Sequence, residues 1–169
     1  MSRFLAPNLR NLAPLEEWPD FTAAAKVLCD ALDEGRTLLV WGDYDVDGIT
    51  STALVKDFMR FHGIKARHHI PNRLEARYGL DVDVSATPAT QGVSCILSVD
   101  AAICEIAPMN LARDMASTVI VRAHPFTAAE MPTAVATANP RLGHCPCPHL
   151  TCVVGAICHM AVTHPLLHA

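Results

Sequence analysis

Apolar residues recur along this chain with two different spacings, and the two spacings alternate. From residue 20 to residue 34 they fall three and four positions apart, which is the period of a helix that buries one face. Asp20 is a residue type that caps helix N-termini, and Gly35 is typical of the position just after a last helical turn. The face that we expect to be buried consists of Phe21, Ala24, Ala25, Leu28 and Leu32.

A second helix is expected over residues 49–61, and the apolar runs around it predict strands. Leu54, Phe58 and Phe61 should face inward from this helix, and Gly63 should end it. Runs that are too short for a helix predict buried strands. These strands cover residues 37–41, 64–70, 95–99 and 118–121, and a further helical stretch is expected over residues 103–115.

Strands that alternate with helices predict an α/β fold. Parallel strands need long crossover connections, so the sheet should be mostly parallel, with about four or five strands and helices on both faces. The chain has 169 residues, 51% of them apolar, which is enough for one domain with a substantial core. We expect the Pro-rich residues 1–19 to be irregular and residues 20–169 to form the domain.

Composition and charge argue against several classes of protein. The sequence has no apolar run that could span a membrane and no secretion signal, so we expect a soluble, cytoplasmic protein whose seven cysteines are reduced. A net charge of −4 argues against a protein coated with nucleic acid. Residues 60–77 nevertheless hold a cluster of Arg, Lys and His, which by itself is typical of a solvated face.

Chemistry is concentrated where the expected strands end. Asp43, Asp45 and Asp47 follow the first strand, Asp100 follows the third and His124 follows the fourth. The carboxyl ends of parallel strands meet at one edge of the sheet, where ligands bind. Three alternating carboxylates repel one another unless a cation lies among them. Mg²⁺ and Mn²⁺ prefer oxygen ligands, and Mn²⁺ also accepts imidazole, so the five side chains predict a divalent-metal site suited to phosphodiester cleavage.

Three stretches around these residues carry a resemblance to a known family. Residues 41–54 read WGDYDVDGITSTAL, residues 69–80 read HIPNRLEARYGL, and residues 98–100 read SVD. They resemble, in this order, the first motif, the next signature and the second metal motif of the RecJ branch of the DHH phosphoesterase superfamily. Residues 139–142 and 149–160 are similar to segments that follow the Asp-His-His triplet for which the superfamily is named. The resemblance covers residues 20–163.

The resemblance implies cleavage of phosphodiesters with Mn²⁺ or Mg²⁺ and, in RecJ itself, 5′-to-3′ digestion of single-stranded DNA. It implies that the catalytic metal ligands are Asp45, Asp47, Asp100 and His124, with Asp43 in support. It also implies that contacts to nucleic acid, on a loop near the metals, are made by Asn72, Arg73, Arg77 and Tyr78.

Several residues depart from the family pattern. The Asp-His-His triplet falls on Ala123, His124 and Pro125, which removes the carboxylate that orients His124 and the histidine that contacts the scissile phosphate. Ala101 and Ala102 stand where a small polar residue and glycine are usual. The sequence ends before the fourth metal-ligating Asp and the substrate-binding domain. We therefore expect hydrolysis of single-stranded DNA or nucleotides to be impaired or lost. The rival hypothesis is a catalytically dead module that binds single-stranded DNA or a protein partner.

Two other metals fit the sequence less well than Mg²⁺ or Mn²⁺. The spacing of the Asp residues also resembles a calcium loop, but Leu54 stands where the loop needs glutamate. A cluster with zinc-type ligands has no standard zinc spacing; it consists of His144, Cys145, Cys147, His149 and Cys152. His68 and His69 are neighbours on an expected strand, so one should be solvated and the other packed.

Overall fold

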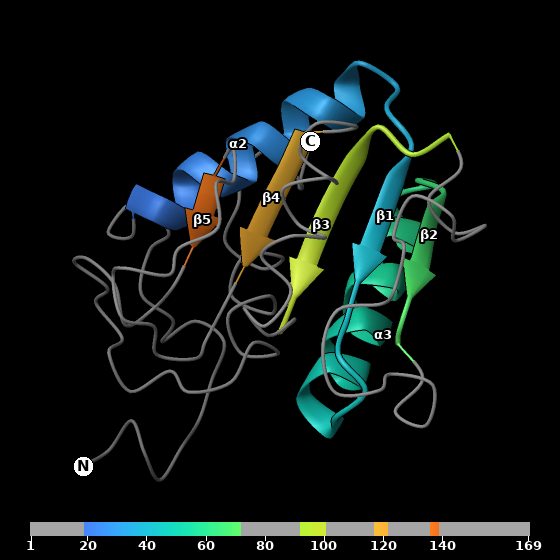
Figure 1. Ribbon diagram of the computed structural model, residues 1–169. Coiled ribbons are helices and arrows are strands. Elements are labelled where there is room, and N and C mark those ends of the chain that lie inside the picture. The colour runs from blue at the N-terminus through green and yellow to red at the C-terminus, as the bar shows by residue number, and fades with distance from the viewer. Residues whose placement is uncertain (1–18, 72–91, 101–116, 122–135, 139–169) are drawn as a thin grey trace, which may run out of the picture.

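The computed structural model describes residues 19–71, 92–100, 117–121 and 136–138, which form two helices and a five-stranded sheet (Figure 1). Helix α2 (Pro19–Asp33) leads to strand β1 (Leu38–Trp41), helix α3 (Val46–Phe61) and strand β2 (Ala66–His69). Strands β3 (Cys95–Val99), β4 (Ser117–Val121) and β5 (Ala136–Ala138) follow. The four expected strands are present, and β5 is a short addition that the apolar pattern did not mark.

All neighbouring strands are parallel, in the order β2-β1-β3-β4-β5. Leu38 of β1 is paired with Ala66 of β2 on one side and with Cys95 of β3 on the other. The chain therefore leaves β1 for the edge strand β2 and returns on the opposite side of β1. Such a reversal of direction opens a crevice at the carboxyl ends of the two strands that flank it.

Helix α2 is amphipathic in the expected way. Phe21, Ala24, Ala25 and Leu28 are buried, and Leu32 packs partly against the same core. The helix begins at Pro19, a residue that suits a first helical position, and Asp20 lies in the first turn instead of before it. Gly35 follows the last turn with a φ of 71° and donates to the carbonyl of Leu32, so the expected ending is confirmed.

The buried face of α3 differs from the one that the apolar pattern predicted. Ser51, Val55 and Met59 lie four residues apart and are buried, whereas Phe61 is 85% exposed. Successive helical residues are 100° apart, so Phe61 points well away from the line that Met59 continues. The expectation that Phe61 faces inward was wrong, because helical phase, and not the apolar character of a side chain, decides which residues are buried. Leu54 and Phe58 pack on the edge of the core, as expected.

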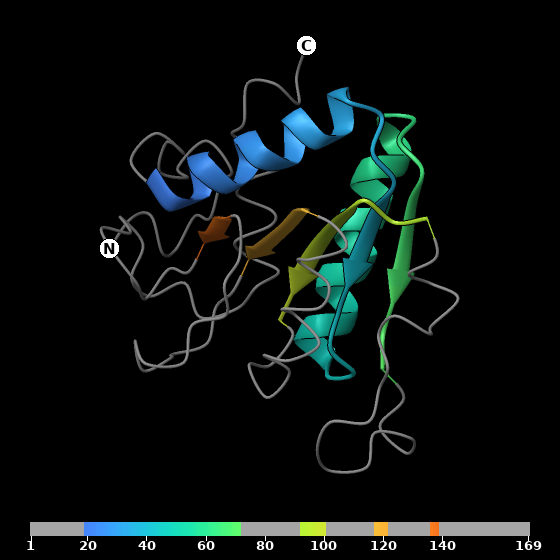
Figure 2. The same ribbon diagram turned by 45° about the horizontal axis from the view of Figure 1, so that its top comes forward.

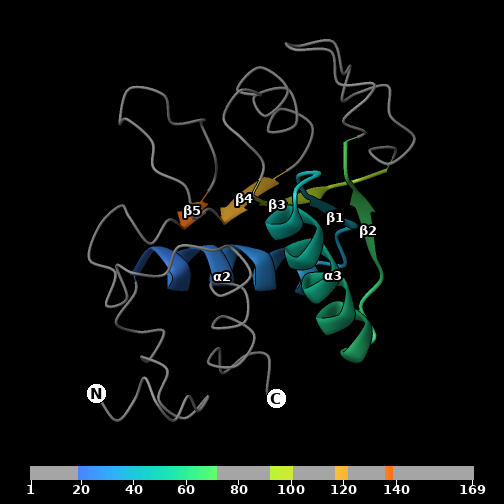
Figure 3. The same cartoon turned by 90° about the horizontal axis from the view of Figure 1, so that it is seen from below.

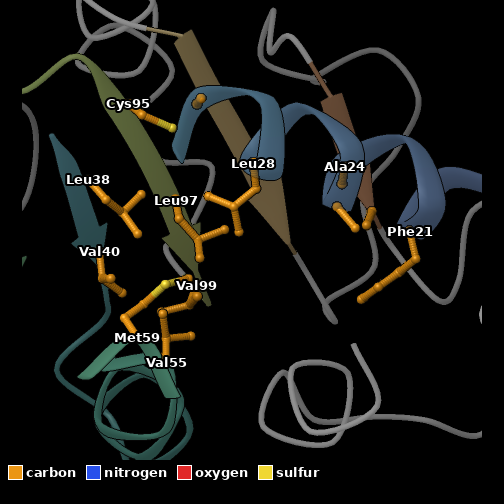
Figure 4. Close-up of a cluster of buried hydrophobic side chains, with 13 residues drawn as sticks. Phe21, Ala24, Leu28, Leu38, Val40, Val55, Met59, Cys95, Leu97 and Val99 are labelled. Carbon is orange, nitrogen blue, oxygen red and sulfur yellow. The ribbon is translucent and has the colours of Figure 1, made fainter. Parts of the chain in front are cut away.

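The core lies between the sheet and both helices, which cover the same face (Figures 3 and 4). In Figure 2, α2 runs across β5, β4 and β3, and α3 runs beside β1 and β2. Alternate strand residues point to the other face, where Leu39, Trp41 and Ile96 are also buried. Burial on both faces is typical of a parallel sheet, and the predicted α/β class is confirmed. Both described helices lie on one face, so helices on the other face stay a prediction.

The described residues contain no helix that is long and apolar enough to cross a membrane. Cys29 and Cys95 are buried and not in disulfides, and Cys95 belongs to the core, as expected. The irregular segment expected over residues 1–19 falls, apart from Pro19, outside the described residues.

The two sides of α3 should respond differently to truncation. Met59→Ala removes a side chain that is 1% exposed and should lower the free energy of unfolding by about 2–5 kcal/mol. Phe61→Ala removes an exposed side chain and should change it by less than about 0.5 kcal/mol. Urea unfolding followed by circular dichroism measures both. Equal losses in the two variants would show that Phe61 is packed in the core.

Candidate metal and phosphate site

The candidate site lies where β1 and β3 end, at the reversal point of the sheet. Trp41 of β1 is paired with Ser98 of β3, and Asp43 and Asp100 each stand two residues beyond this pair. Because the strands are parallel, both residues leave the sheet at the same edge. The predicted meeting of the first and third strand ends is confirmed.

Two glycines let the chain turn directly from β1 into α3. A Cβ at Gly48 would lie 2.5 Å from the carbonyl oxygen of Asp43 and 2.6 Å from its nitrogen. A Cβ at Gly42 would collide with the hydroxyl of Thr52. At Gly48 no side chain fits unless the backbone moves, and at Gly42 the side chain of Thr52 would have to shift. The carboxylate loop, residues 43–47, is therefore held tightly against the first turns of α3.

The three carboxylates of this loop surround the N-terminus of α3. Asp45 caps the helix, because its Oδ1 accepts a hydrogen bond of 2.8 Å from the backbone N–H of Gly48. Asp47 lies in the first turn. Asp43 accepts a hydrogen bond of 2.6 Å from the backbone N–H of Tyr44. The positive end of the helix dipole and the free N–H groups thus offset part of the repulsion.

Asp100 completes the cluster from the side of β3. Its side chain is buried, and its φ of 57° lies in the left-handed region, where Asp is tolerated better than most residues. Burial raises its pKa to about 7, and the charges of Asp45, Asp47 and Asp43 add to this, together with a hydrogen bond to Asp45. The structure therefore brings Asp43, Asp45 and Asp47 close enough to Asp100 for their charges to raise its pKa. Burial also raises the pKa of Asp43, against the hydrogen bond from Tyr44.

A divalent cation fits this cluster in its chemistry. Carboxylate oxygens are the ligands that Mg²⁺ and Mn²⁺ prefer, and a cation would relieve the repulsion that raises the pKa of Asp100. Within the described ranges, however, no three His, Cys, Asp or Glu side chains are arranged to hold a metal ion. The described carboxylates therefore do not form a complete metal site by themselves. His124, the fifth predicted ligand, lies outside the described residues.

The comparisons with known proteins agree with this geometry. Residues 37–166 match the model of the DHH family, N-terminal domain. The chain belongs to the DHH family. Its DHH domain is 35% identical over 145 residues to the single-stranded-DNA-specific exonuclease RecJ of Dickeya dadantii and 34% identical over 142 residues to that of Escherichia coli. These matches cover 85% and 83% of this chain but 25% of each relative, so the chain spans about a quarter of their length.

Two solved structures share the fold of this DHH domain. Exonuclease RecJ bound to manganese superposes with a TM-score of 0.66 at 25% identity, over 87% of this chain and 38% of the other. RecJ of Thermus thermophilus in complex with Mn²⁺ superposes with a TM-score of 0.70 at 23% identity, over 97% of this chain and 23% of the other. The structural neighbours are thus manganese-bound proteins, which supports a metal-dependent family.

Sequence reasoning missed the polar groups beneath the loop of the DHH domain. Ser51 and Thr52 are buried on α3, and their hydroxyls have no hydrogen-bond partner in the described structure. The sequence itself contained a signal for these residues. Ser51 and Thr52 are small and polar, and they follow the Asp43–Gly48 motif in a helix whose inner face was expected to be apolar. Gly42 leaves room for the hydroxyl of Thr52, with which a side chain at position 42 would collide.

The two neighbouring histidines behave as predicted. His68 is exposed, whereas His69 is partly buried, with its ring centroid 4.2 Å from that of Trp41. Burial lowers the pKa of His69, and the neighbouring His68 lowers it further. The predicted nucleic-acid contacts Asn72, Arg73, Arg77 and Tyr78 lie outside the described residues, as does the Cys/His cluster of residues 144–152.

Gly48→Ala should destabilise the DHH domain although alanine is the better helix former. Elsewhere in a helix the change would stabilise by up to about 1 kcal/mol, but here the new methyl group meets the backbone of Asp43. We expect a loss of about 1–3 kcal/mol in urea unfolding. Thr50→Ala, at an exposed position in the same turn, is the control. A gain of stability in Gly48→Ala would contradict the close approach of the loop.

Mn²⁺ should stabilise the domain more at pH 8 than at pH 6. The pKa of Asp100 is about 7 in the metal-free protein, so below pH 7 the ion must displace a proton and its affinity falls by about tenfold per pH unit. Without metal the sign is opposite. A raised pKa in the folded state means that stability present at low pH is lost as the pH rises through 7.

The measurement is the melting temperature at pH 6 and pH 8, with and without millimolar Mn²⁺, where saturation is worth a few kcal/mol. Asp100→Asn should remove both effects. Asp57→Asn is the control, because Asp57 is an exposed carboxylate in an ion pair with Arg60. An equal Mn²⁺ shift at both pH values, or one that survives in Asp100→Asn, would exclude Asp100 from the site.

Proposed function

We propose that this DHH domain hydrolyses phosphodiester bonds of single-stranded DNA with Mn²⁺ or Mg²⁺, and that its turnover is impaired. The observation that supports this proposal most directly is the group of four carboxylates around the ends of β1 and β3, of which Asp100 is buried. The relatives named as single-stranded-DNA-specific exonucleases support the choice of substrate, and 5′-to-3′ digestion is the direction to test.

The residues of this chain would divide the work as follows. Asp45, Asp47, Asp100 and His124 would hold the metal, with Asp43 supporting the loop through its hydrogen bond to Tyr44. A bound divalent ion would lower the pKa of the attacking water and neutralise charge on the phosphate. The chain contributes positioning, because Gly42 and Gly48 fix the loop and the N-cap bond fixes one oxygen of Asp45.

Substrate contacts are proposed on the segment that follows β2. Arg73 and Arg77 carry guanidinium groups, which match the geometry of phosphate oxygens. Asn72 and Tyr78 can donate hydrogen bonds to the same backbone. A single strand of DNA or a short nucleotide would be held there while its scissile phosphate lies at the carboxylates.

The impairment is proposed from two residues next to His124. Ala123 provides no carboxylate to orient the imidazole of His124, a kind of loss that typically costs about 10- to 100-fold in metal affinity or activity. Pro125 provides no side-chain donor to a phosphate on which charge develops, and such a donor is typically worth about 10²- to 10³-fold. The same two residues favour the second candidate function, a catalytically inactive domain that binds single-stranded DNA or a protein partner.

Digestion of 5′-labelled single-stranded DNA with Mn²⁺ should be slow and should disappear in Asp47→Ala. That variant reports contaminating nuclease, since it lacks a proposed ligand. Equal digestion by the parent chain and by Asp47→Ala would favour the second candidate function, a catalytically inactive binding domain. Fast digestion by the parent chain would show that the two departures have little effect.

A further inference from the structure

A second set of side chains, unused by the proposed chemistry, lies on the second half of α3, on the turn that follows it and on β2. Between residues 48 and 71 the chain has four Lys or Arg residues and a single acidic residue, in a protein with a net charge of −4. We call the set formed by Lys56, Phe61, His62, Lys65 and His68 the α3–β2 corner. It lies at the edge of the sheet, because β2 is the end strand (Figure 1).

The positive charge of this corner is poorly compensated. Lys56 has its Nζ 2.7 Å from Nδ1 of His68, and since an ammonium group can only donate, the imidazole accepts. Two basic groups are thus paired with each other. No carboxylate among the described residues forms an ion pair with Lys56 or Lys65. The nearby pair of Arg60 with Asp57 is exposed and therefore weak.

An exposed aromatic ring stands at the last residue of α3, five residues after Lys56 and four residues before Lys65. Phe61 is 85% exposed, the highest fraction among the large hydrophobic residues described. Its ring centroid lies 5.2 Å from that of His62, whose ring in turn lies 4.6 Å from that of Phe58. Phe58 packs on the core, so this stack anchors an aromatic ring that is otherwise open to solvent.

Positive charge together with exposed aromatic rings is the combination that holds single strands without regard to sequence. Lys and Arg follow the phosphates, and successive bases stack on aromatic side chains. A duplex offers its phosphates but keeps its bases inside. A protein partner would find the apolar area of Phe61 but would need acidic groups around it to match Lys56 and Lys65. A single strand supplies both chemistries at once.

We propose that the α3–β2 corner binds single-stranded DNA, with a base stacked on Phe61 and phosphates beside Lys56 and Lys65. The corner is distinct from the carboxylate cluster, because α3 carries Asp47 in its first turn and Phe61 at its last residue. Phe61 and Lys65 precede β2, which is parallel to β1, so they lie at the edge of the sheet opposite to the carboxylates. The corner thus holds a part of the strand that is away from the scissile bond. The choice of DNA rests on the proposed function.

The test is fluorescence anisotropy of a labelled oligothymidylate with the 169-residue chain in EDTA, so that no metal site is involved. Phe61→Ala should weaken binding by about 5- to 100-fold, the loss typical of one stacked base. Lys56→Gln with Lys65→Gln should lower the salt dependence of log K by about 1.4, or about 0.7 for each phosphate contact. Lys26→Gln is the matched control, because Lys26 is exposed on α2 and paired with Asp30. It should bind like the parent chain.

Two further variants separate the explanations. Phe61→Trp should retain binding and Phe61→Leu should lose it, because only the aromatic ring has a face for stacking. The assay measures binding in EDTA, where no hydrolysis takes place, so a failure of the proposed catalytic function leaves this result unaffected. The proposal is overturned if Phe61→Ala binds like the parent, if Phe61→Leu retains full affinity, or if duplex DNA of the same length binds as tightly. The proposal is also overturned, in favour of an acidic protein partner, if polyglutamate displaces the oligothymidylate and if the Lys56→Gln, Lys65→Gln variant loses affinity for polyglutamate to the same extent.

Discussion

The arrangement of the site depends on one close approach, that of the Asp43 backbone to the α-carbon of Gly48. It lets β1 turn into α3 within a few residues, so that three carboxylates are held at a helix N-terminus and beside the end of β3. Within this turn Asp45 caps the helix. Asp100 is then buried against the same group from the neighbouring strand. A longer loop would leave the carboxylates apart and solvated, without the repulsion that makes them suitable for a cation.

This arrangement opposes the stability of the metal-free domain. Burying Asp100 next to three other acidic residues costs free energy, and its left-handed backbone adds strain. The surrounding structure compensates with a continuous apolar core of α2, α3, β1 and β3 (Figure 4). Strain and unpaired polar groups concentrated at a strand end, with regular packing elsewhere, are typical of a domain whose rigid sheet supports a chemical site.

Much of this could be predicted from the sequence, and the errors have identifiable reasons. The α/β class, the four longer strands and the meeting of Asp43 with Asp100 followed from apolar periods and from the rule that parallel strands end at one edge. The inner face of α3 was predicted wrongly, because Phe61 is more apolar than Ser51 or Thr52 and side-chain type was trusted over helical phase. Hydroxyls are buried there since the tight loop leaves room only for small side chains, a constraint that arises in three dimensions. The three residues of β5 were too few to show a period.

The order of the strands has a consequence for how the domain assembles. β1, α3 and β2 are consecutive in the chain and pair with each other, so they can form a local unit with low loop-closure cost. That unit already contains the carboxylate loop but leaves it open to water on the side of β3. Only when β3 pairs with β1, across an intervening stretch of chain, is Asp100 delivered and desolvated. The acidic cluster therefore depends on the long-range pairing of β3 with β1, and a cation that binds the cluster would stabilise this pairing.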